Sequence, residues 1–307
     1  MAPPSTGIRV GLTSTSSLLP EQRPRNPTRR PFVPRAARES GIRPAKALGQ
    51  HFLTDRNVVT KIVAAAELTP EEIVIEVGPG LGVLTERLVD ATDRVIAVEL
   101  DRGLASRLRE RYAGDARLAV IEGDVLAFSP RVLLESAGQP SSTPYVVVGN
   151  LPYNIGAAVL RHFLEAAPPP RRLVVMLQRE VAAAIVAPPG ALGLVGVSVQ
   201  VYARARRLFN VPARAFYPPP KVVSSVLRLD VLDTPLVPAS ERDRFFAIVR
   251  AGFSAPRKQL RNSLAQGTKR PATDVLAAIE SVGIDPRLRP EDLGIDDWLR
   301  LARAVEV

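Results

Sequence analysis

The chain has 307 residues, a formal net charge of +10, a sequence pI near 10.5 and no cysteine. The lack of cysteine excludes disulfides, thiol nucleophiles, iron–sulfur clusters and cysteine-ligated zinc. The two histidines, His51 and His162, are far apart in sequence, so we expect no metal site. Apolar residues make up 46% of the chain, and no uncharged apolar run approaches the roughly 20 residues of a membrane span. We therefore expect a folded protein that does not enter a membrane.

The positive charge is concentrated in two segments. Residues 1–43 and residues 250–270 each carry a net charge of +6, and the remainder of the chain is slightly acidic. Arginine use in a GC-rich genome also raises the charge, but charge gathered in one folded segment is typical of a surface that neutralises nucleic-acid phosphates. The residues of this segment that we expect to bind nucleic acid are Arg250, Arg257, Lys258 and Arg261.

The first 43 residues contain eight arginines, seven prolines and two acidic residues, without apolar periodicity. Such a segment cannot bury enough apolar surface to offset its ordering entropy, so we predict a disordered extension. Its arginine-rich, acid-poor composition also resembles an organellar transit peptide. A flexible bacterial extension or a misplaced start codon is the preferred interpretation. It predicts a cytoplasmic protein, with an organellar location as the alternative.

From residue 55 onward, short apolar strand patterns alternate with amphipathic helical patterns. The predicted strands are Ile73–Val77, Val95–Val98, Leu118–Ile121, Tyr145–Val148 and Leu173–Leu177, and the predicted helices lie at Asn57–Leu68, Leu84–Leu88, Leu104–Tyr112 and Val159–Leu164. This alternation indicates the α/β class, with a mostly parallel, doubly wound sheet of the Rossmann-like kind. A later strand, Val222–Leu229, is expected to pair antiparallel near the edge.

After about residue 236 the pattern becomes helical. The expected helices are Arg242–Gly252, Gln259–Leu264, Ala272–Ser281 and Asp296–Ala304. We therefore predict a sheet domain at 44–235 and a small all-helical C-terminal domain at 236–307, which contains the basic segment.

A glycine-rich loop follows the first predicted strand. Gly78, Gly80 and Gly82 come directly after Ile73–Val77 and before a helix. Glycines let the backbone turn sharply and approach a ligand closely, although a tight turn without a ligand would use the same residues. The spacing differs from the dinucleotide-binding G-x-G-x-x-G pattern, and no phosphate-binding G-x-x-x-x-G-K-[ST] loop occurs.

Acidic residues follow the next two strands. Glu99 ends the second strand and Asp124 follows the third, so a parallel sheet would bring both beside the glycine loop. A carboxylate at Glu99 can accept ribose hydroxyls, and one at Asp124 can accept an adenine amino group. Because nothing nearby neutralises a pyrophosphate, these positions favour S-adenosylmethionine over NAD as the cofactor.

The fourth strand is followed by Asn150-Leu151-Pro152-Tyr153. A proline turn with a core tyrosine would explain this loop structurally. The same residues are also suited to binding an adenine amine. An adenine exocyclic amine is a poor nucleophile, because its lone pair is delocalised into the ring. The Asn150 side-chain oxygen and a backbone carbonyl of Leu151 or Pro152 could accept both amine protons and direct the lone pair at a methyl donor. Proline presets the backbone, so catalysis would be mostly positioning.

Tyr153 could stack on the base, which must be flipped out or lie in a loop to reach such a pocket. A second aromatic ring is available in the segment Val211–Lys221, where Phe216 or Tyr217 could cover the other face. A proline-stiffened hairpin with core aromatics is the structural alternative. Together these features predict methyl transfer to adenine in RNA.

The same motifs give the chain a resemblance to the small-subunit ribosomal RNA adenine dimethyltransferase family. The resemblance runs from about Lys46 to the C-terminus, roughly 85% of the chain. The matching blocks are Leu48–Leu53, the loop at Gly78, Glu99, Asp124, Asn150–Tyr153, Phe216–Ser224, Gly252–Ser254, Arg257–Asn262 and Leu288–Leu293. One departure is His51, where many relatives have asparagine.

The resemblance implies a class I methyltransferase fold and an enzyme that dimethylates two adjacent adenosines in the 3′-terminal hairpin loop of small-subunit ribosomal RNA, with a role in ribosome biogenesis. It implies a monomer that acts on RNA or on an immature small subunit. It implies a target adenine between Tyr153 and Phe216 and RNA contacts in the basic segment and at Lys221. The implied cofactor contacts are His51, Leu53, Gly78, Glu99, Asp124 and Asn150.

Three alternatives remain open. One is a large-subunit ribosomal RNA adenine dimethyltransferase that confers antibiotic resistance, which would share the cofactor loop and the aromatic pocket. Another is a nicotinamide-dependent oxidoreductase, which would bind NAD instead of S-adenosylmethionine. The third is a non-catalytic ribosome-assembly or RNA-binding factor. An adenine deaminase is excluded, because its zinc needs cysteine ligands.

Overall fold

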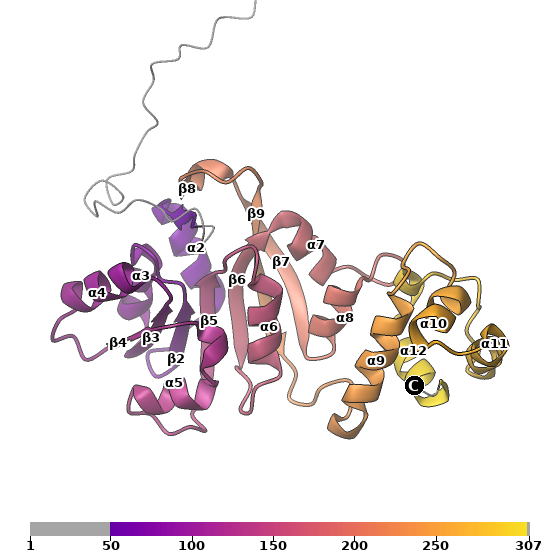
Figure 1. The fold of residues 1–307 in the computed structure, drawn as a ribbon. Helices are drawn as coiled ribbons and strands as arrows, with labels where there is room; N and C mark the ends of the chain where they lie inside the picture. The colour runs from indigo at the N-terminus through magenta and orange to yellow at the C-terminus, as the bar shows by residue number, and fades with distance from the viewer. Residues whose placement is uncertain (1–49, 306–307) are drawn as a thin grey trace, which may run out of the picture. The chain divides into compact units, whose positions relative to one another are not determined.

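The computed structural model describes residues 50–305, and the predicted extension 1–43 lies outside the described residues. A seven-stranded sheet has the order β4-β3-β2-β5-β6-β9-β7 (Figure 1). The strands are β2 (Ile73–Val77), β3 (Arg94–Glu99), β4 (Leu118–Glu122), β5 (Tyr145–Asn150), β6 (Arg172–Gln178), β7 (Ala203–Val211) and β9 (Ser224–Val231). Strands β2 to β6 are parallel, and β9 pairs antiparallel with β6 and β7. The predicted α/β class is confirmed.

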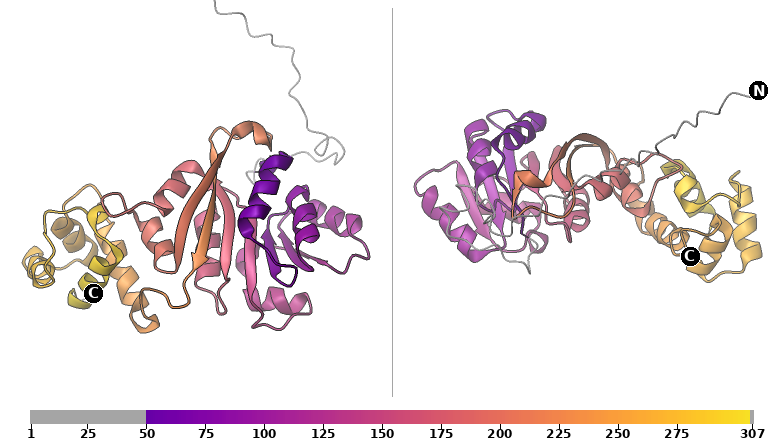
Figure 2. Two further views of the ribbon diagram at one scale, coloured as in Figure 1. Left: turned by 180° about the vertical axis from the view of Figure 1, so that it is seen from behind. Right: turned by 90° about the horizontal axis from the view of Figure 1, so that it is seen from above.

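Helices cover both faces of the sheet, because its central strands are apolar on both sides. One face is buried by α2 (Arg56–Ala66) and α3 (Val83–Ala91), and Figure 2 shows α2 lying across it. The opposite face packs against α5 (Pro130–Ser136), α6 (Gly156–Leu164), α7 (Arg179–Ile185) and α8 (Leu194–Gln200). The remaining helix of this part, α4 (Arg102–Arg111), contacts β3 and β4.

A second, two-stranded sheet joins distant parts of the chain. In it β1 (Phe52–Leu53) pairs antiparallel with β8 (Phe216–Tyr217). The Asp55 carboxylate accepts hydrogen bonds from the first amides of α2, so α2 begins directly after β1. This pairing brings residues near position 50 to the carboxyl ends of the parallel strands.

The edge strand β7 is absent from the strands predicted above. Its sequence, ARARRLFNV, contains three arginines and shows a register shift between Arg207 and Phe209, so it lacks the regular apolar alternation that marks a strand. Because it pairs with β9 on one side only, most of its residues are solvent-exposed and need not be apolar. The predicted strand at Val222–Leu229 corresponds to β9, which lies next to this edge and is antiparallel as expected.

The chain beyond β9 contains α9 (Arg242–Gly252), α10 (Leu260–Thr268), α11 (Ala272–Ser281) and α12 (Ile295–Ala304). Their buried residues, including Phe245 and Trp298, belong to the same continuous apolar cluster as one face of the sheet. The division at residue 236 stays a prediction, since secondary structure changes there without a separate core. No helix within residues 50–305 has the length and apolar character to cross a membrane.

Candidate functional site

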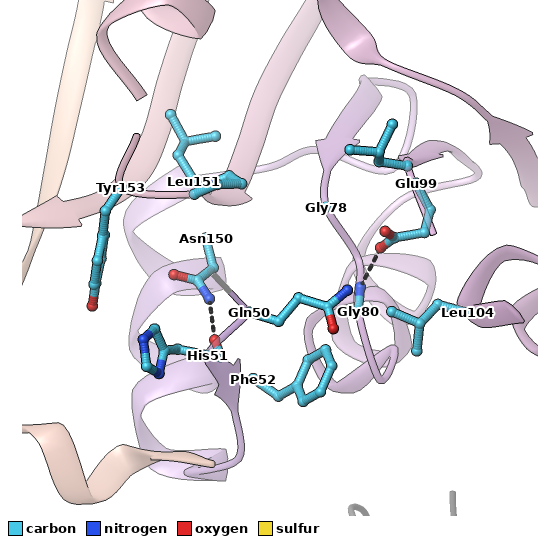
Figure 3. A pocket seen from close by; sticks show the side chains of 12 residues that line it. Gln50, His51, Phe52, Gly78, Gly80, Glu99, Leu104, Asn150, Leu151 and Tyr153 are labelled. Carbon is cyan, nitrogen blue, oxygen red and sulfur yellow. Dashed lines mark hydrogen bonds between the residues drawn. The ribbon is translucent and has the colours of Figure 1, made fainter. Parts of the chain in front are cut away.

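A pocket opens where the carboxyl ends of β2, β3 and β5 meet. It has a volume of about 610 Å³ including its open mouth. The residues that line it are Gln50, His51, Phe52, Gly78, Gly80, Glu99, Leu100, Leu104, Asn150, Leu151, Pro152 and Tyr153 (Figure 3). Ligands of open α/β sheets bind at this end of the strands, so the pocket is the candidate active site.

The glycine loop forms the floor of the pocket. Gly78, Gly80 and Gly82 have φ values of +67°, +56° and +74°, which side chains disfavour. A Cβ atom at Gly80 would also lie 3.0 Å from the Phe52 ring. The loop therefore needs glycine both for its turns and for the space beside Phe52.

The Glu99 carboxylate is oriented by backbone amides. Its Oε2 accepts from the Gly80 amide at 2.9 Å, and its Oε1 accepts from the Asp101 amide at 2.9 Å. Burial raises the pKa of Glu99, while these amides act in the opposite direction. Each oxygen keeps a second lone pair, so this carboxylate can still accept hydroxyl donors from a ligand.

A second carboxylate, Glu76, lies beneath the glycine loop. It is fully buried, and neither of its oxygens has a hydrogen-bond partner among the described residues. Burial raises the pKa of Glu76 from 4.5 to about 8; the Thr85 hydroxyl acts in the opposite direction, and the nearby Glu99 charge adds to the rise. Glu76 also lines a small cavity with Gly78, Gly80 and Asn150. A buried carboxylate without a partner is a place for a ligand cation. Glu76 is missing from the site residues expected from the sequence, because a single acid inside an apolar strand carries no motif.

The side-chain amide of Asn150 has a defined orientation. Its Nδ2 donates a hydrogen bond of 3.0 Å to the His51 backbone carbonyl (Figure 3). A carbonyl can only accept, so this contact assigns the nitrogen to that side and leaves the Oδ1 atom free to accept from a ligand. This is the orientation that an acceptor for an amine proton requires.

Tyr153 is held by a contact at each end. Its hydroxyl shares a 2.7 Å hydrogen bond with Ser224 Oγ at the start of β9, and its ring stacks on His51 with centroids 5.8 Å apart. Burial raises the pKa of the Tyr153 phenol, so the ring stays neutral. A neutral aromatic ring fixed at the mouth of the pocket is suited to stacking.

Comparisons with known proteins give the family. A sequence profile of the ribosomal RNA adenine dimethylase family matches residues 43–306. The chain belongs to this family. It is therefore a ribosomal RNA adenine dimethyltransferase that uses S-adenosylmethionine, as the resemblance implied.

The alignments with curated relatives cover most of this chain and most of each relative. The Ribosomal RNA small subunit methyltransferase A of Dehalococcoides mccartyi is 44% identical over 260 residues, which is 85% of this chain and 88% of the relative. The protein of the same name from Moorella thermoacetica is 38% identical over 275 residues, covering 88% and 95%.

Solved structures show the same fold. The 23S rRNA methyltransferase ErmE superimposes with a TM-score of 0.63 at 30% identity, covering 82% of this chain and 98% of that one. A dimethyladenosine transferase from Plasmodium falciparum gives a TM-score of 0.69 at 24% identity, covering 82% and 96%.

The pocket of this dimethyltransferase fits its cofactor. S-adenosylmethionine combines an ammonium group, ribose hydroxyls and a methyl group on a sulfonium, and it supplies that methyl for transfer. Glu76 offers a buried carboxylate for a cation, and Glu99 offers acceptors for hydroxyls. The glycine loop lets a ligand approach the backbone closely.

Three of the residues predicted to bind the cofactor or the target adenine lie outside the pocket lining. Asp124 is exposed, and its Oδ1 accepts from the Leu126 amide at 3.0 Å, so it caps a short 3₁₀ helix. Leu53 is buried in β1 and lines the small cavity that also contains Glu76. Phe216 pairs with Leu53, is 3% exposed and packs in the core beneath α2 and α3. Its ring offers no open face to a base in this arrangement, so its stacking role stays a prediction that requires β8 to move.

The predicted RNA-binding residues are solvent-exposed. Arg250 lies in α9 and Arg261 in α10, and Arg257 and Lys258 lie in the connection between these helices. The Lys258 ammonium donates to Gln266 Oε1 at 3.2 Å. Because Gln266 is uncharged, this contact does not neutralise the positive charge of Lys258. Lys221 is exposed in the connection from β8 to β9.

Gly149 controls how close the Asn150 strand lies to its neighbour. A Cβ at Gly149 would lie 2.7 Å from the Val77 carbonyl oxygen on β2, and this backbone atom has little room to move away. We expect Gly149→Ala to lower the free energy of unfolding by about 1–3 kcal/mol and to reduce kcat by displacing Asn150. Urea denaturation measures the first effect. Gly193→Ala, where a Cβ meets nothing within 4 Å, should leave kcat unchanged and, because Gly193 is the N-cap of α8, lower the free energy of unfolding by less than about 1 kcal/mol.

Proposed function

We propose that this dimethyltransferase methylates the exocyclic amines of two adjacent adenosines in the 3′-terminal hairpin loop of small-subunit ribosomal RNA. The proposal also includes a role in ribosome biogenesis, as a monomer that acts in the cytoplasm. The curated relatives named for small-subunit RNA support it, being 38–44% identical over most of the chain. ErmE, which is named for 23S rRNA, is 30% identical.

The observation that carries the chemistry is the orientation of the Asn150 amide. With Nδ2 engaged by the His51 carbonyl, Oδ1 is available to accept one proton of an adenine amine. A second acceptor is needed for the other amine proton. The Pro152 carbonyl already accepts from the Ile155 amide at 3.2 Å, whereas the Leu151 carbonyl has no backbone partner among the described residues. We therefore assign the second acceptor to Leu151.

Two acceptors draw the amine nitrogen towards a tetrahedral geometry and aim its lone pair at the methyl donor. Pro152 stabilises the turn that presents the Leu151 carbonyl. Tyr153 stacks on the base and fixes its plane. The amine proton becomes acidic only as the nitrogen–carbon bond forms, so positioning replaces a strong general base.

On the cofactor side, we assign Glu99 to the ribose hydroxyls and the backbone at Gly78 to close approach of the ligand. We assign Glu76 to the cofactor ammonium, because this buried carboxylate lacks a partner among the described residues. His51 and Asn150 contribute through the hydrogen bond between them, and Leu53 shapes the adjoining cavity. We assign Asp124 to the adenine amino group, because its Oδ1 accepts from the Leu126 amide while a carboxylate has further lone pairs that can accept.

The function is tested by incubating immature small subunits and large-subunit RNA separately with the protein and labelled S-adenosylmethionine. Mass spectrometry and primer extension should find dimethyladenosine at two neighbouring positions of small-subunit RNA only. Label confined to large-subunit RNA would instead establish the antibiotic-resistance activity. If Asn150→Ala abolished methylation and deletion of the protein left ribosome maturation unaffected, the biogenesis role would lose its support.

We expect the basic residues between α9 and α10 to set RNA affinity. Replacing Arg257, Lys258 and Arg261 with glutamine should weaken RNA binding at all sequences and reduce the salt slope by roughly 2–3, because three phosphate contacts are removed. Filter binding between low and moderate salt measures both effects. The matched control replaces Arg87, Arg107 and Arg109, exposed arginines of α3 and α4, with glutamine. An equal loss in the control would show that net charge alone matters.

A further inference from the structure

One edge of the large sheet carries positive charge along its length. Strand β7 is the edge strand beside β9 (Figure 1), and three of its nine residues are exposed arginines: Arg204, Arg206 and Arg207. Arg214, also exposed, follows in the short 3₁₀ helix Ala213–Ala215. We call these four arginines the β7 edge. None of them lines the pocket.

Most of the charge on the β7 edge is not neutralised by neighbouring acids. Arg206 donates to Asp230 at 2.9 Å, but the same carboxylate also accepts from Arg228 at 2.8 Å. Within residues 50–305, the other three arginines of the β7 edge form no ion pair with a carboxylate. Three guanidinium groups are therefore available to an anionic partner.

Charged side chains on an edge strand also prevent pairing with other chains, so the opposite edge of the sheet is a useful comparison. Strand β4 forms that edge and contains no basic residue. Its one charged side chain, Glu122, pairs with Arg109 at 3.4 Å. Because both strands have one unpaired side, edge protection by itself does not account for the excess of positive charge on β7.

The β7 edge is continuous with the mouth of the pocket. Strand β7 is antiparallel to β9, which is antiparallel to β6, so β7 ends at the same end of the sheet as the pocket. The chain then passes through Arg214 into β8, which pairs with β1, and Phe52 of β1 lines the pocket. A strand rises about 3.3 Å per residue, so the arginines extend roughly 20 Å along the edge from this end.

An RNA hairpin whose loop enters the pocket extends beyond it as a stem. Double-stranded RNA is recognised mostly through its phosphates and 2′-hydroxyls, and a guanidinium matches a phosphate with two parallel donors. Resting on the proposed hairpin substrate, we propose that the β7 edge binds the phosphate backbone of the stem next to the target loop. This surface is separate in the sequence from the basic segment 250–270 and gives the enzyme a second contact with the same RNA.

The test combines Arg204→Gln, Arg207→Gln and Arg214→Gln in the full-length protein. Arg206 is retained, because its removal would take a partner from Asp230. Filter binding compares two hairpin RNAs of the small-subunit 3′ end, one with the whole stem and one with the stem cut to the pairs that close the loop. Wild type should bind the whole stem roughly 10-fold more tightly than the cut one. The triple variant should bind both alike, and its salt slope for the whole stem should fall by roughly 2–3.

Two further variants separate charge on this edge from charge in general. Lysine at the same three positions keeps the charge and should stay within about threefold of wild type. Glutamine at Arg87, Arg107 and Arg109, exposed on α3 and α4, should leave the preference for the whole stem unchanged. Calorimetry with S-adenosylhomocysteine and gel filtration check that each protein is folded and does not self-associate. If the triple variant aggregates, the three single glutamine variants carry the test, each with a salt slope lower by about 1.

The outcomes separate this inference from the function on which it rests. If wild-type protein neither binds nor methylates the hairpin or the immature subunit, the proposed substrate fails and the stem contact with it. If wild type methylates the hairpin but the glutamine variants keep the preference for the whole stem, the β7 edge does not bind the stem. An equal loss of affinity for both RNAs would overturn the proposal as well. Self-association with an unchanged stem preference would show that these arginines only protect the edge.

Discussion

Asn150→Ala is expected to reduce kcat by about 10²–10³-fold, which corresponds to about 3–4 kcal/mol of lost transition-state stabilisation. The substitution removes the only side-chain oxygen that the described residues show oriented for the target amine, through the 3.0 Å contact with the His51 carbonyl. Binding of RNA should change little, because the basic surface and Tyr153 are untouched. Single-turnover methylation of RNA with labelled cofactor measures the chemical step directly.

Asn150→Asp provides the stricter comparison. It retains an acceptor oxygen, but it places a second oxygen against the His51 carbonyl where Nδ2 now donates. Repulsion between these oxygens should rotate the carboxylate away, so activity should remain far below wild type although an acceptor is present. Asn154→Ala, a neighbouring exposed amide, is the matched control and should retain full activity. Wild-type kcat in Asn150→Ala would contradict the mechanism.

Glu76→Gln is expected to stabilise the cofactor-free protein, with a gain that grows as pH rises from about 5 to 8. In the folded chain burial raises the pKa of Glu76 from 4.5 to about 8, so the native state retains a proton that the unfolded chain has released. The contribution of the protonated Glu76 to the free energy of unfolding is fully present below pH 4.5. It is lost as pH rises towards 8. Glutamine is neutral at every pH and avoids this loss.

The expected gain at pH 8 is on the order of 2–4 kcal/mol, measured by urea unfolding across the pH range. Glu135→Gln, at an exposed position in α5, should show no such pH-dependent gain. A difference between Glu76→Gln and wild type that does not vary with pH would show that Glu76 is charged in the native state throughout.

The same substitution should weaken cofactor binding. An ammonium placed against Glu76 would compensate the buried carboxylate, and glutamine cannot supply that charge. We expect roughly 10- to 100-fold weaker binding of S-adenosylhomocysteine, measured by calorimetry near neutral pH. A substitution that stabilises the free protein but weakens cofactor binding would show that Glu76 serves binding at a cost in stability. Unchanged affinity would remove it from the cofactor site.

Much of the architecture follows from periodicity. Apolar strand patterns alternating with helical ones determine the parallel sheet, and the carboxyl ends of parallel strands share one edge by geometry. Strand order along the chain is therefore enough to predict that the Gly78 loop, Glu99 and Asn150 lie together. The folded chain brings all three to one pocket. The motif Asn150–Tyr153 needs no tertiary information to suggest an acceptor beside an aromatic ring.

Other features of the fold and of the site depend on contacts between residues that are distant in the sequence. Strand β7 is arginine-rich because it lies at an edge, so its pattern does not indicate a strand. The burial of Phe216 follows from the pairing of β8 with β1, more than 160 positions earlier. Asp124 has a local cap to fill, which a pattern of strand ends cannot reveal.

The sequence alone determined the fold class, the edge of the sheet that holds the site, and the residue types available for amine-directed methyl transfer. Only the tertiary structure decided how those residues are used. It oriented the Asn150 amide through a carbonyl 99 positions away, set His51 against Tyr153 and Pro218, and left Glu76 buried without a partner among the described residues. The physical reason is that strand geometry is encoded locally by alternating apolar residues. Hydrogen-bond direction and burial depend on which distant segments pack together.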